Sequence, residues 1–181
     1  MTALHAAAVA TLTAWQPPSM EQDALRHAFL AYLDARPDAC ARSCVPGHLT
    51  ASLVLLDATA EHVLLTLHPR VGRWLQLGGH CEPHDRDPAA VAMREAAEES
   101  GITGIQTDRV PVHLAVYPAV CTIDGPTRHF DIAFFGIAPD GAPAPHDSPA
   151  LAWWPLNALP ENSDPLPAMV AQSMRRYSRS R

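Results

Sequence analysis

The stretch "GGHCEPHDRDPAAVAMREAAEESGI", residues 78–102, decides both the fold and the chemistry expected of this chain. Its central part predicts a helix over residues 88–100. Asp87 is a suitable N-cap, and Pro88 fits the first helical position, where a missing backbone N–H does no harm. Gly101 follows where a left-handed C-terminal cap is needed.

Three carboxylates crowd one side of this predicted helix, because Glu95, Glu98 and Glu99 are spaced i, i+3 and i+4. Like charges at such spacing cost a few tenths of a kcal/mol per pair. The helix dipole also disfavours anions in the last turn, by roughly 0.3–1 kcal/mol each. A divalent cation would offset these costs, since Mg²⁺ prefers carboxylate and phosphate oxygens. The preceding Gly78 and Gly79 would let a metal or phosphate approach the backbone closely.

A simpler interpretation is a solvated acidic face on which Arg94 and Glu98 form an ordinary i,i+4 ion pair. The longer pattern R-E-x-x-E-E-x-G, which starts at Arg94, argues against it. At average composition this pattern arises about once in 10⁶ starting positions. The sequence therefore favours a cation site that also binds a phosphate-bearing substrate.

The composition fits one domain with an appendage, since the chain has 181 residues, 48% of them hydrophobic. The net charge is −6 and Lys and Arg form no block, which argues against duplex nucleic acid as a partner. No apolar run approaches the ~18 residues of a membrane span, and the N-terminus lacks the basic region of a signal peptide. A cytoplasmic location with reduced thiols is expected.

The rest of the chain predicts an α/β fold with a mixed sheet. Residues 1–45 are expected to form an N-terminal helical extension, chiefly through a helix over residues 20–36, and residues 46–181 to form the main domain. Strands are expected over residues 48–57, 62–68, 73–79, 110–120 and 128–138. Residues 139–167 hold eight of the 18 prolines and should be loop-rich, before a short closing helix.

The helix and its glycines resemble the Nudix box, G-x5-E-x7-R-E-U-x-E-E-x-G-U, in which U is a bulky apolar residue. The matching residues are Gly79, Arg94, Glu95, Glu98, Glu99, Gly101 and Ile102. The resemblance covers residues 48–159 and includes Trp153-Trp154-Pro155-Leu156, which is similar to the W-x-P-L segment of the family. The chain departs from the pattern at Asp85, which replaces the first Glu and leaves one extra residue before Arg94. It also has Ala96 at the U position and Leu77 where many members have Pro.

Membership of the Nudix hydrolase family would imply an α/β/α sandwich and Mg²⁺- or Mn²⁺-dependent hydrolysis of a nucleoside diphosphate linked to another group. By position, the implied metal ligands are Glu95, Glu98, Glu99 and the Gly78 carbonyl. Arg94 would orient the helix carboxylates. The general base is Glu95 or Glu98 on the helix, which we prefer, or Asp147 in the proline-rich loop.

Substrate contacts are less defined. Arg70 and Arg73 flank the strand that ends in glycines and could meet a phosphate, or they could lie on a solvated surface. His129 and Asp131 share one face of a strand, where they could face the substrate pocket or form a buried pair. The expected partner is a small nucleotide or another diphosphate, and both a monomer and a homodimer are compatible with the sequence.

Three other interpretations stay open at this point. Nudix-like domains also act as sensors that bind nucleotides or ADP-ribose without cleavage, although these often lose helix carboxylates. Isopentenyl diphosphate isomerases share the fold and use Cys, His and Glu around a metal, which makes Cys81 relevant. Finally, the spacing Cys40-x3-Cys44-x3-His48 offers three potential zinc ligands, one fewer than a structural zinc site requires.

Overall fold

The computed structural model describes residues 2–69, 72–120, 126–142, 150–161, 163 and 165–179. The helices are α1 (Ala3–Ala14), α2 (Met20–Ala35), α3 (Pro88–Ser100) and α4 (Leu166–Tyr177). The strands are β1 (His48–Leu56), β2 (His62–His68), β3 (Arg73–His80), β4 (Gln106–Thr107), β5 (His113–Val120), β6 (Pro126–Ile137) and β7 (Leu151–Pro155). Among the described residues, no helix is both long enough and apolar enough to span a membrane.

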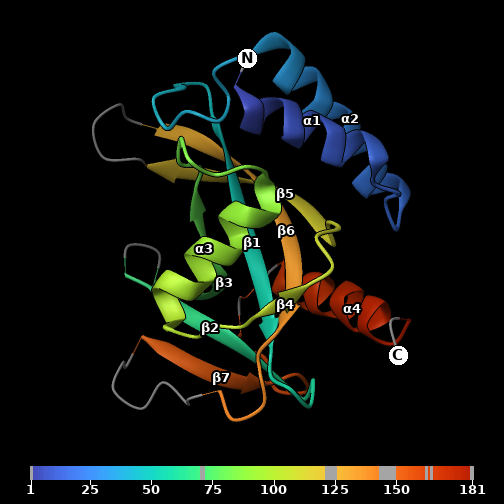
Figure 1. Ribbon diagram of the computed structural model, residues 1–181, viewed down its shortest axis with the longest axis vertical. Helices are drawn as coiled ribbons and strands as arrows, with labels where there is room; N and C mark the ends of the chain where they lie inside the picture. Colours follow the sequence, from blue (N-terminus) through green and yellow to red (C-terminus); the bar gives the residue numbers. More distant parts are fainter. Residues whose placement is uncertain are drawn as a thin grey trace.

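The described strands form one mixed sheet in the order β4-β6-β1-β3-β2-β7, with β5 paired to β6 (Figure 1). Strand β1 lies at the centre and runs parallel to β6, whereas it pairs with β3 in the antiparallel sense. The parallel register sets His48 beside His129 and continues to Leu56 beside Ile137. The predicted mixed sheet is confirmed.

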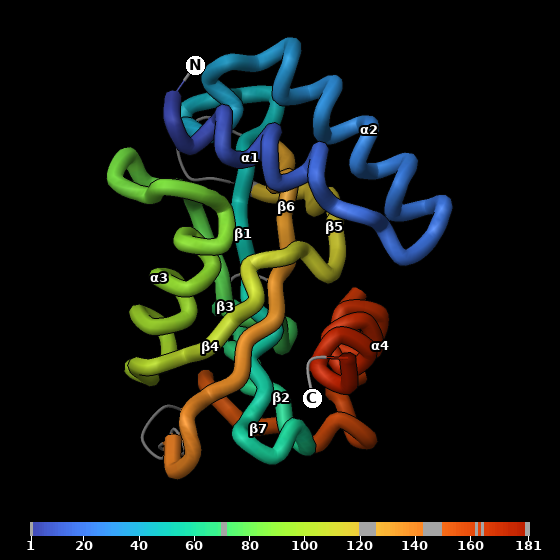
Figure 2. The backbone as a smooth tube through the Cα atoms, turned by 45° about the vertical axis from the view of Figure 1, so that its right-hand side comes forward, coloured from blue at the N-terminus to red at the C-terminus, as the bar shows by residue number. Residues whose placement is uncertain are grey.

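Helices cover both faces of this sheet, as the views of Figures 1 and 2 show. One hydrophobic cluster joins α3, α1 and α2 to the first face, and a second cluster joins α4 to the other face. The α/β/α sandwich is therefore confirmed.

Strand β1 is buried along its whole length because layers lie on both of its faces. Leu49, Ala51 and Leu53 belong to the cluster under α3, whereas Val54 and Leu56 belong to the cluster under α4. Side chains alternate along a strand, so the polar residues between Leu49 and Leu53 face away from α3. This alternation places a polar strip on the sheet face opposite α3.

Two helices precede the residues of the main domain. Thr2 and Ser19 cap them, each accepting a backbone N–H in the first turn. The side chain of Gln22 binds β5 at both backbone groups of Leu114, with a 2.7 Å bond from its N–H and a 3.0 Å bond to its carbonyl. The ring of Tyr32 stacks on Phe130 of β6, with centroids 4.2 Å apart. The helices thus share the core of the sheet, while the division into domains at residue 45 stays a prediction.

Most predicted elements are confirmed, with small differences in their bounds. The short strands β4 and β7 were not predicted. Strand β7 lies inside the proline-rich region and pairs with β2 from His62↔Pro155 to Thr66↔Leu151. Proline is tolerated there because β7 is an edge strand and Pro155 is its last residue.

Candidate active site

Helix α3 begins and ends at the residues that the sequence indicated. The side chain of Asp87 accepts a hydrogen bond from the Ala90 N–H at 2.9 Å, and Pro88 occupies the first turn. Gly101 adopts a left-handed conformation with φ 70°, and its N–H donates to the Ala97 carbonyl at 2.8 Å. Asp87 also forms an ion pair with Arg109, which ties the helix start to the segment after β4.

The buried face of α3 packs against the sheet. It is formed by Pro88, Ala89, Val91, Ala92 and Ala96. Glu95 lies at the border of this face, with only 18% of its side chain exposed. Small side chains allow α3 to pack closely on β1 and β3, and this close approach draws the carboxylate of Glu95 toward the sheet.

Of the two glycines at the end of β3, Gly79 lies against this carboxylate and Gly78 lies against β1. A Cβ atom at Gly79 would lie 2.5 Å from Cδ of Glu95, and one at Gly78 would lie 2.6 Å from Cα of Ser52 on β1. Real Cβ atoms do not approach other atoms so closely, so a side chain at Gly79 would displace the carboxylate of Glu95, and one at Gly78 would displace the backbone of β1. The backbone N–H of Gly78 donates to Oε2 of Glu99 at 3.1 Å.

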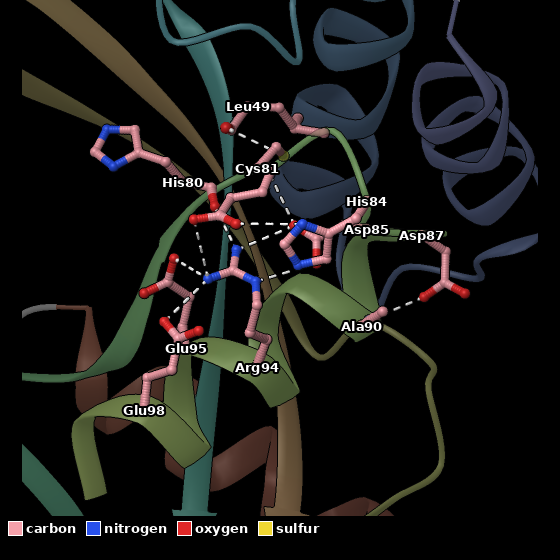
Figure 3. A network of polar contacts seen from close by, with 11 residues as sticks. Leu49, His80, Cys81, His84, Asp85, Asp87, Ala90, Arg94, Glu95 and Glu98 are labelled. Carbon is pink, nitrogen blue, oxygen red and sulfur yellow. Dashed lines mark hydrogen bonds and ion pairs between the residues drawn. The ribbon is translucent and has the colours of Figure 1, made fainter.

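Arg94 is the centre of the polar network on α3 (Figure 3). Its Nη1 donates to Oε1 of Glu95 at 2.9 Å and to Oε2 of Glu98 at 3.2 Å. Its Nη2 donates to the His80 carbonyl at 2.8 Å. A planar guanidinium can bind several carboxylates at once, so a single side chain fixes two of the three glutamates that are predicted metal ligands.

Asp85 binds the other edge of the same guanidinium, with Nε donating to Oδ1 at 3.1 Å and Nη2 to Oδ2 at 3.0 Å. It also accepts the Glu82 N–H at 2.8 Å, which closes the loop before the helix. Burial alone would raise the pKa of Asp85, but the bonds from Arg94 and from the Glu82 amide lower it below its ordinary value. The longer loop therefore still delivers an acidic partner to Arg94.

The glutamates on the sheet side of α3 are poorly stabilised as anions. Burial raises the pKa of Glu95, and the nearby Glu98 adds to this effect against the opposing influence of Arg94. Glu99 is exposed as a residue, yet its carboxylate lies against the Gly78 backbone. Partial desolvation there, with repulsion from Glu95 and Glu98, raises the pKa of Glu99 to about 7.

The remaining predicted site residues are more scattered. Glu98 lies beside Glu95 with 59% of its side chain exposed. Arg73 starts β3, at the opposite end of the strand from the two glycines. Arg70 and Asp147 lie outside the described residues, so their predicted roles stay predictions.

His129 and Asp131 lie on the sheet face opposite α3. Asp131 is buried and accepts hydrogen bonds from the hydroxyls of Thr50 at 2.9 Å and Ser52 at 2.6 Å. Burial raises the pKa of Asp131 despite these two bonds. The ring of His129 lies close to those of His48 and His80. The sequence did not predict this meeting of rings, because only the register of three separate strands creates it.

The two cysteines predicted as zinc ligands contact different partners. The sulfur of Cys44 lies 3.3 Å from the Tyr32 hydroxyl, and Cys40 packs against the core cluster beside Cys81. The thiol of Cys81 donates to the Leu49 carbonyl at 3.5 Å. Its hydrogen bond with Cys40 and its burial raise the pKa of Cys81. A protonated thiol held in this way is a poor metal ligand or acid, which disfavours the isomerase interpretation.

Comparison with known proteins agrees with this architecture. Solved structures with a similar fold include NrtR from Shewanella oneidensis, with 20% identity and a TM-score of 0.53 over 73% of this chain and 64% of that chain. A NUDIX-family hydrolase from Clostridium perfringens matches with 20% identity and a TM-score of 0.50, over 75% of this chain and 99% of the other. A binary complex of a C. elegans Ap4A hydrolase matches with 18% identity and a TM-score of 0.51, over 72% and 97%.

At these identities the structural matches show the fold alone, and the chain spans less than two thirds of NrtR. A search of curated protein sequences finds no match. The family model described as NUDIX domain matches residues 46–178, which is well over half of the chain. The chain therefore belongs to the Nudix hydrolase family.

Proposed function

We propose that this protein hydrolyses a phosphoanhydride bond in a nucleoside diphosphate linked to another group, with Mg²⁺ or Mn²⁺ as cofactor. The substrate is a small molecule and not duplex nucleic acid. The proposed location is the cytoplasm, where free thiols such as those of Cys40, Cys44 and Cys81 stay reduced. The proposal leaves both a monomer and a homodimer open.

The observation that carries the proposal is the set of glutamates gathered at the glycine pair. Glu95 and Glu98 are held by one guanidinium, and the carboxylate of Glu99 lies against the backbone of Gly78. On a solvated acidic helix face, the carboxylates would lie apart from one another and in contact with water. Here the protein desolvates two of the carboxylates and raises their pKa values.

This donor set fits a hard divalent cation. Glu95, Glu98, Glu99 and the carbonyl of Gly78 would hold it, since all four offer oxygen. Gly79 leaves the space beside Glu95 that any larger side chain would fill. When bound, such a cation neutralises charge on a diphosphate and lowers the pKa of bound water.

The side chains on and just before α3 have separate proposed roles. Arg94 orients Glu95 and Glu98 by donating to both, and Asp85 holds Arg94 from the opposite edge. Glu95 or Glu98 would accept the proton of the attacking water, with Asp147 as the alternative base. Of the two helix glutamates, Glu98 is the more accessible to solvent water, with 59% of its side chain exposed against 18% for Glu95.

The test is product analysis by mass spectrometry after incubation with a nucleotide panel and Mg²⁺ or Mn²⁺. The panel contains nucleoside triphosphates, sugar nucleotides, ADP-ribose and dinucleoside polyphosphates. Glu98→Gln removes one negative charge with little change in shape. We expect this variant to lose at least ~100-fold in turnover, since even residues that only support a metal ligand contribute 10–100-fold. Glu61→Gln, an exposed residue before β2, is the matched control and should keep wild-type turnover.

Cleavage that needs both the metal and Glu98 would support the hydrolase, and the fragment masses would name the bond broken. Wild-type rates in a folded Glu98→Gln variant would remove Glu98 from the mechanism. If the panel is bound but nothing is cut, the sensor interpretation replaces the proposed function.

A further inference from the structure

Three histidines from distant parts of the chain meet on the sheet face opposite α3. His48 is the first residue of β1, His80 is the last of β3, and His129 lies in β6. The register pairs His48 with His129, and it pairs His80 with Thr50, two residues along β1 from His48. All three side chains therefore lie on one face. Figure 3 shows the ring of His80 turned away from Arg94 and Glu95.

The rings form a compact triangle. Their centroids are 5.0 Å apart for His48 and His80, and 4.9 Å apart for each pair that includes His129. One ring nitrogen from each residue lies within 4.8 Å of the other two. Imidazole nitrogens bound to one tetrahedral zinc ion at ~2.0–2.1 Å are about 3.4 Å apart. Binding would therefore require ring rotations that shorten the largest of these distances by up to roughly 1.4 Å.

We propose that His48, His80 and His129 form a second metal site, separate from the carboxylates of α3. This site binds one divalent transition-metal ion such as Zn²⁺. Imidazole nitrogen suits Zn²⁺, Co²⁺, Ni²⁺, Cu²⁺ and Fe²⁺, whereas Mg²⁺ requires oxygen. Three protein ligands leave one position for water or another ligand, as in zinc sites that are not purely structural.

Ordinary core packing is a weaker explanation of this cluster. His48 is only 1% exposed, and the other two rings are half-buried against it. Three charged rings at this spacing would repel one another, so the site suits neutral imidazoles, the form that binds metals. Burial, together with the neighbouring charges, lowers the pKa of His80 and of His129 to about 4.

One neighbour works against a cation at this site. The exposed Arg42 lies near enough to lower the pKa of all three histidines. Its positive charge would favour an anion in the fourth position of the metal, such as hydroxide or a phosphate oxygen. The buried Asp131 lies two residues beyond His129 on the same face, and it accepts hydrogen bonds from the hydroxyls of Thr50 and Ser52.

The test measures metal binding and needs no substrate. The full chain, without an affinity tag, is freed of metal with a chelator and titrated with Co²⁺, whose visible spectrum reports nitrogen ligands. Zinc content after equilibrium dialysis gives the stoichiometry. We expect one equivalent of Co²⁺ with the spectrum of nitrogen ligands, and at least a tenfold weaker affinity for this ion in His80→Ala and in His129→Ala.

Two variants serve as matched controls. His27→Ala removes an exposed histidine of α2, and Glu98→Gln alters the carboxylate site on the other face. Both should keep the Co²⁺ spectrum and the affinity of the wild type. Circular dichroism shows whether each variant is folded. If His80→Ala does not fold, His80→Gln replaces it, and His129→Gln replaces His129→Ala in the same way.

The proposal is overturned if the wild type binds no Co²⁺ or Zn²⁺ at micromolar concentrations. It is also overturned if binding survives unchanged in folded His80 and His129 variants, or if Glu98→Gln abolishes it. The last result would assign the ion to α3 and leave the imidazoles as packing. Failure of the nucleotide panel would not affect this outcome, because hydrolysis is not measured.

Discussion

The two faces of the central sheet gather ionisable groups in opposite ways. On the face under α3, carboxylates crowd around one arginine and two glycines. On the other face, three imidazoles meet beside a buried carboxyl group that is bound by two hydroxyls. The first set offers oxygen ligands with negative charge, and the second offers nitrogen ligands without charge.

The two sets arise in different ways: local sequence creates the acidic set, and strand register creates the imidazole set. The acidic set comes mostly from one helix of 13 residues, so a short pattern is enough to specify it. The imidazole set spans His48 to His129 and exists only because β1 lies between β3 and β6. Substitutions that act on one face and spare the other therefore test whether the two sites are independent.

The largest effect is expected from Arg94→Ala. This change leaves Asp85, whose side chain is 3% exposed, without its cationic partner. Removal of one member of a buried ion pair typically costs 3–5 kcal/mol. We expect the free energy of unfolding to fall by about 3 kcal/mol in urea denaturation, together with loss of hydrolysis.

Arg36→Ala provides the matched control, because Arg36 forms an ion pair with Asp38 at the exit of α2, where half of the Asp38 side chain is exposed. Exposed pairs of this kind contribute little to stability, so we expect a much smaller loss than in Arg94→Ala. Equal losses in the two variants would contradict the central role assigned to Arg94. The imidazole face should keep its affinity for Co²⁺ in both folded proteins.

Gly79→Ala should have the next largest effect, and on activity more than on binding of Co²⁺. The new Cβ would overlap the carboxylate of Glu95, so Glu95 must move by an ångström or more. Misplacement of a reacting group by about 1 Å can cost 10²-fold in rate. We expect a roughly 10- to 100-fold loss of turnover in steady-state assays.

Gly136→Ala separates this effect from a general loss of packing. Its Cβ would lie 2.9 Å from Cγ2 of Ile105, close enough to strain the core at the β4 end of β6. This variant should lower the melting temperature but keep the wild-type rate below that temperature. A comparable loss of rate in both variants would show that Gly79 acts through stability alone.

Much of the fold could be predicted from the sequence because its signals are local. Asp87, Pro88 and Gly101 mark the bounds of α3 by cap chemistry, and the glycines mark the end of β3. The alternation of β2 predicts its strand. By contrast, β4 is two residues long, and β7 lies among prolines, so neither has a periodic pattern of its own.

The candidate site could be predicted only where one helix carries it. Glu95, Glu98 and Glu99 were found together because helical spacing puts them on neighbouring turns. The partnership of Asp85 with Arg94 depends on how the longer loop folds back, and the meeting of His48 with His80 depends on strand register. Neither relation is encoded in a short window, although the alternation of His129 and Asp131 was a partial signal.

The last expected difference between the two faces is the pH dependence of their metal affinities. A raised carboxyl pKa means that the folded protein holds its proton more tightly than the unfolded chain does. The cost of ionising Glu99 is therefore absent at low pH and fully present above about pH 7. A cation must displace this proton, so Mn²⁺ affinity should fall by up to tenfold per pH unit below pH 7.

Electron paramagnetic resonance of Mn²⁺ between pH 5 and 8 would measure this slope. Glu99→Gln should bind Mn²⁺ more weakly and flatten the slope, leaving the smaller contribution of Glu95, whose pKa is also raised. The imidazole face should behave differently, because the pKa values of His80 and His129 are lowered to about 4. Its affinity for Co²⁺ should therefore fall less between pH 8 and 5 than the affinity of the carboxylates for Mn²⁺. A common pH profile for the two ions would mean that both bind the same groups, and the two faces would then hold one metal site between them.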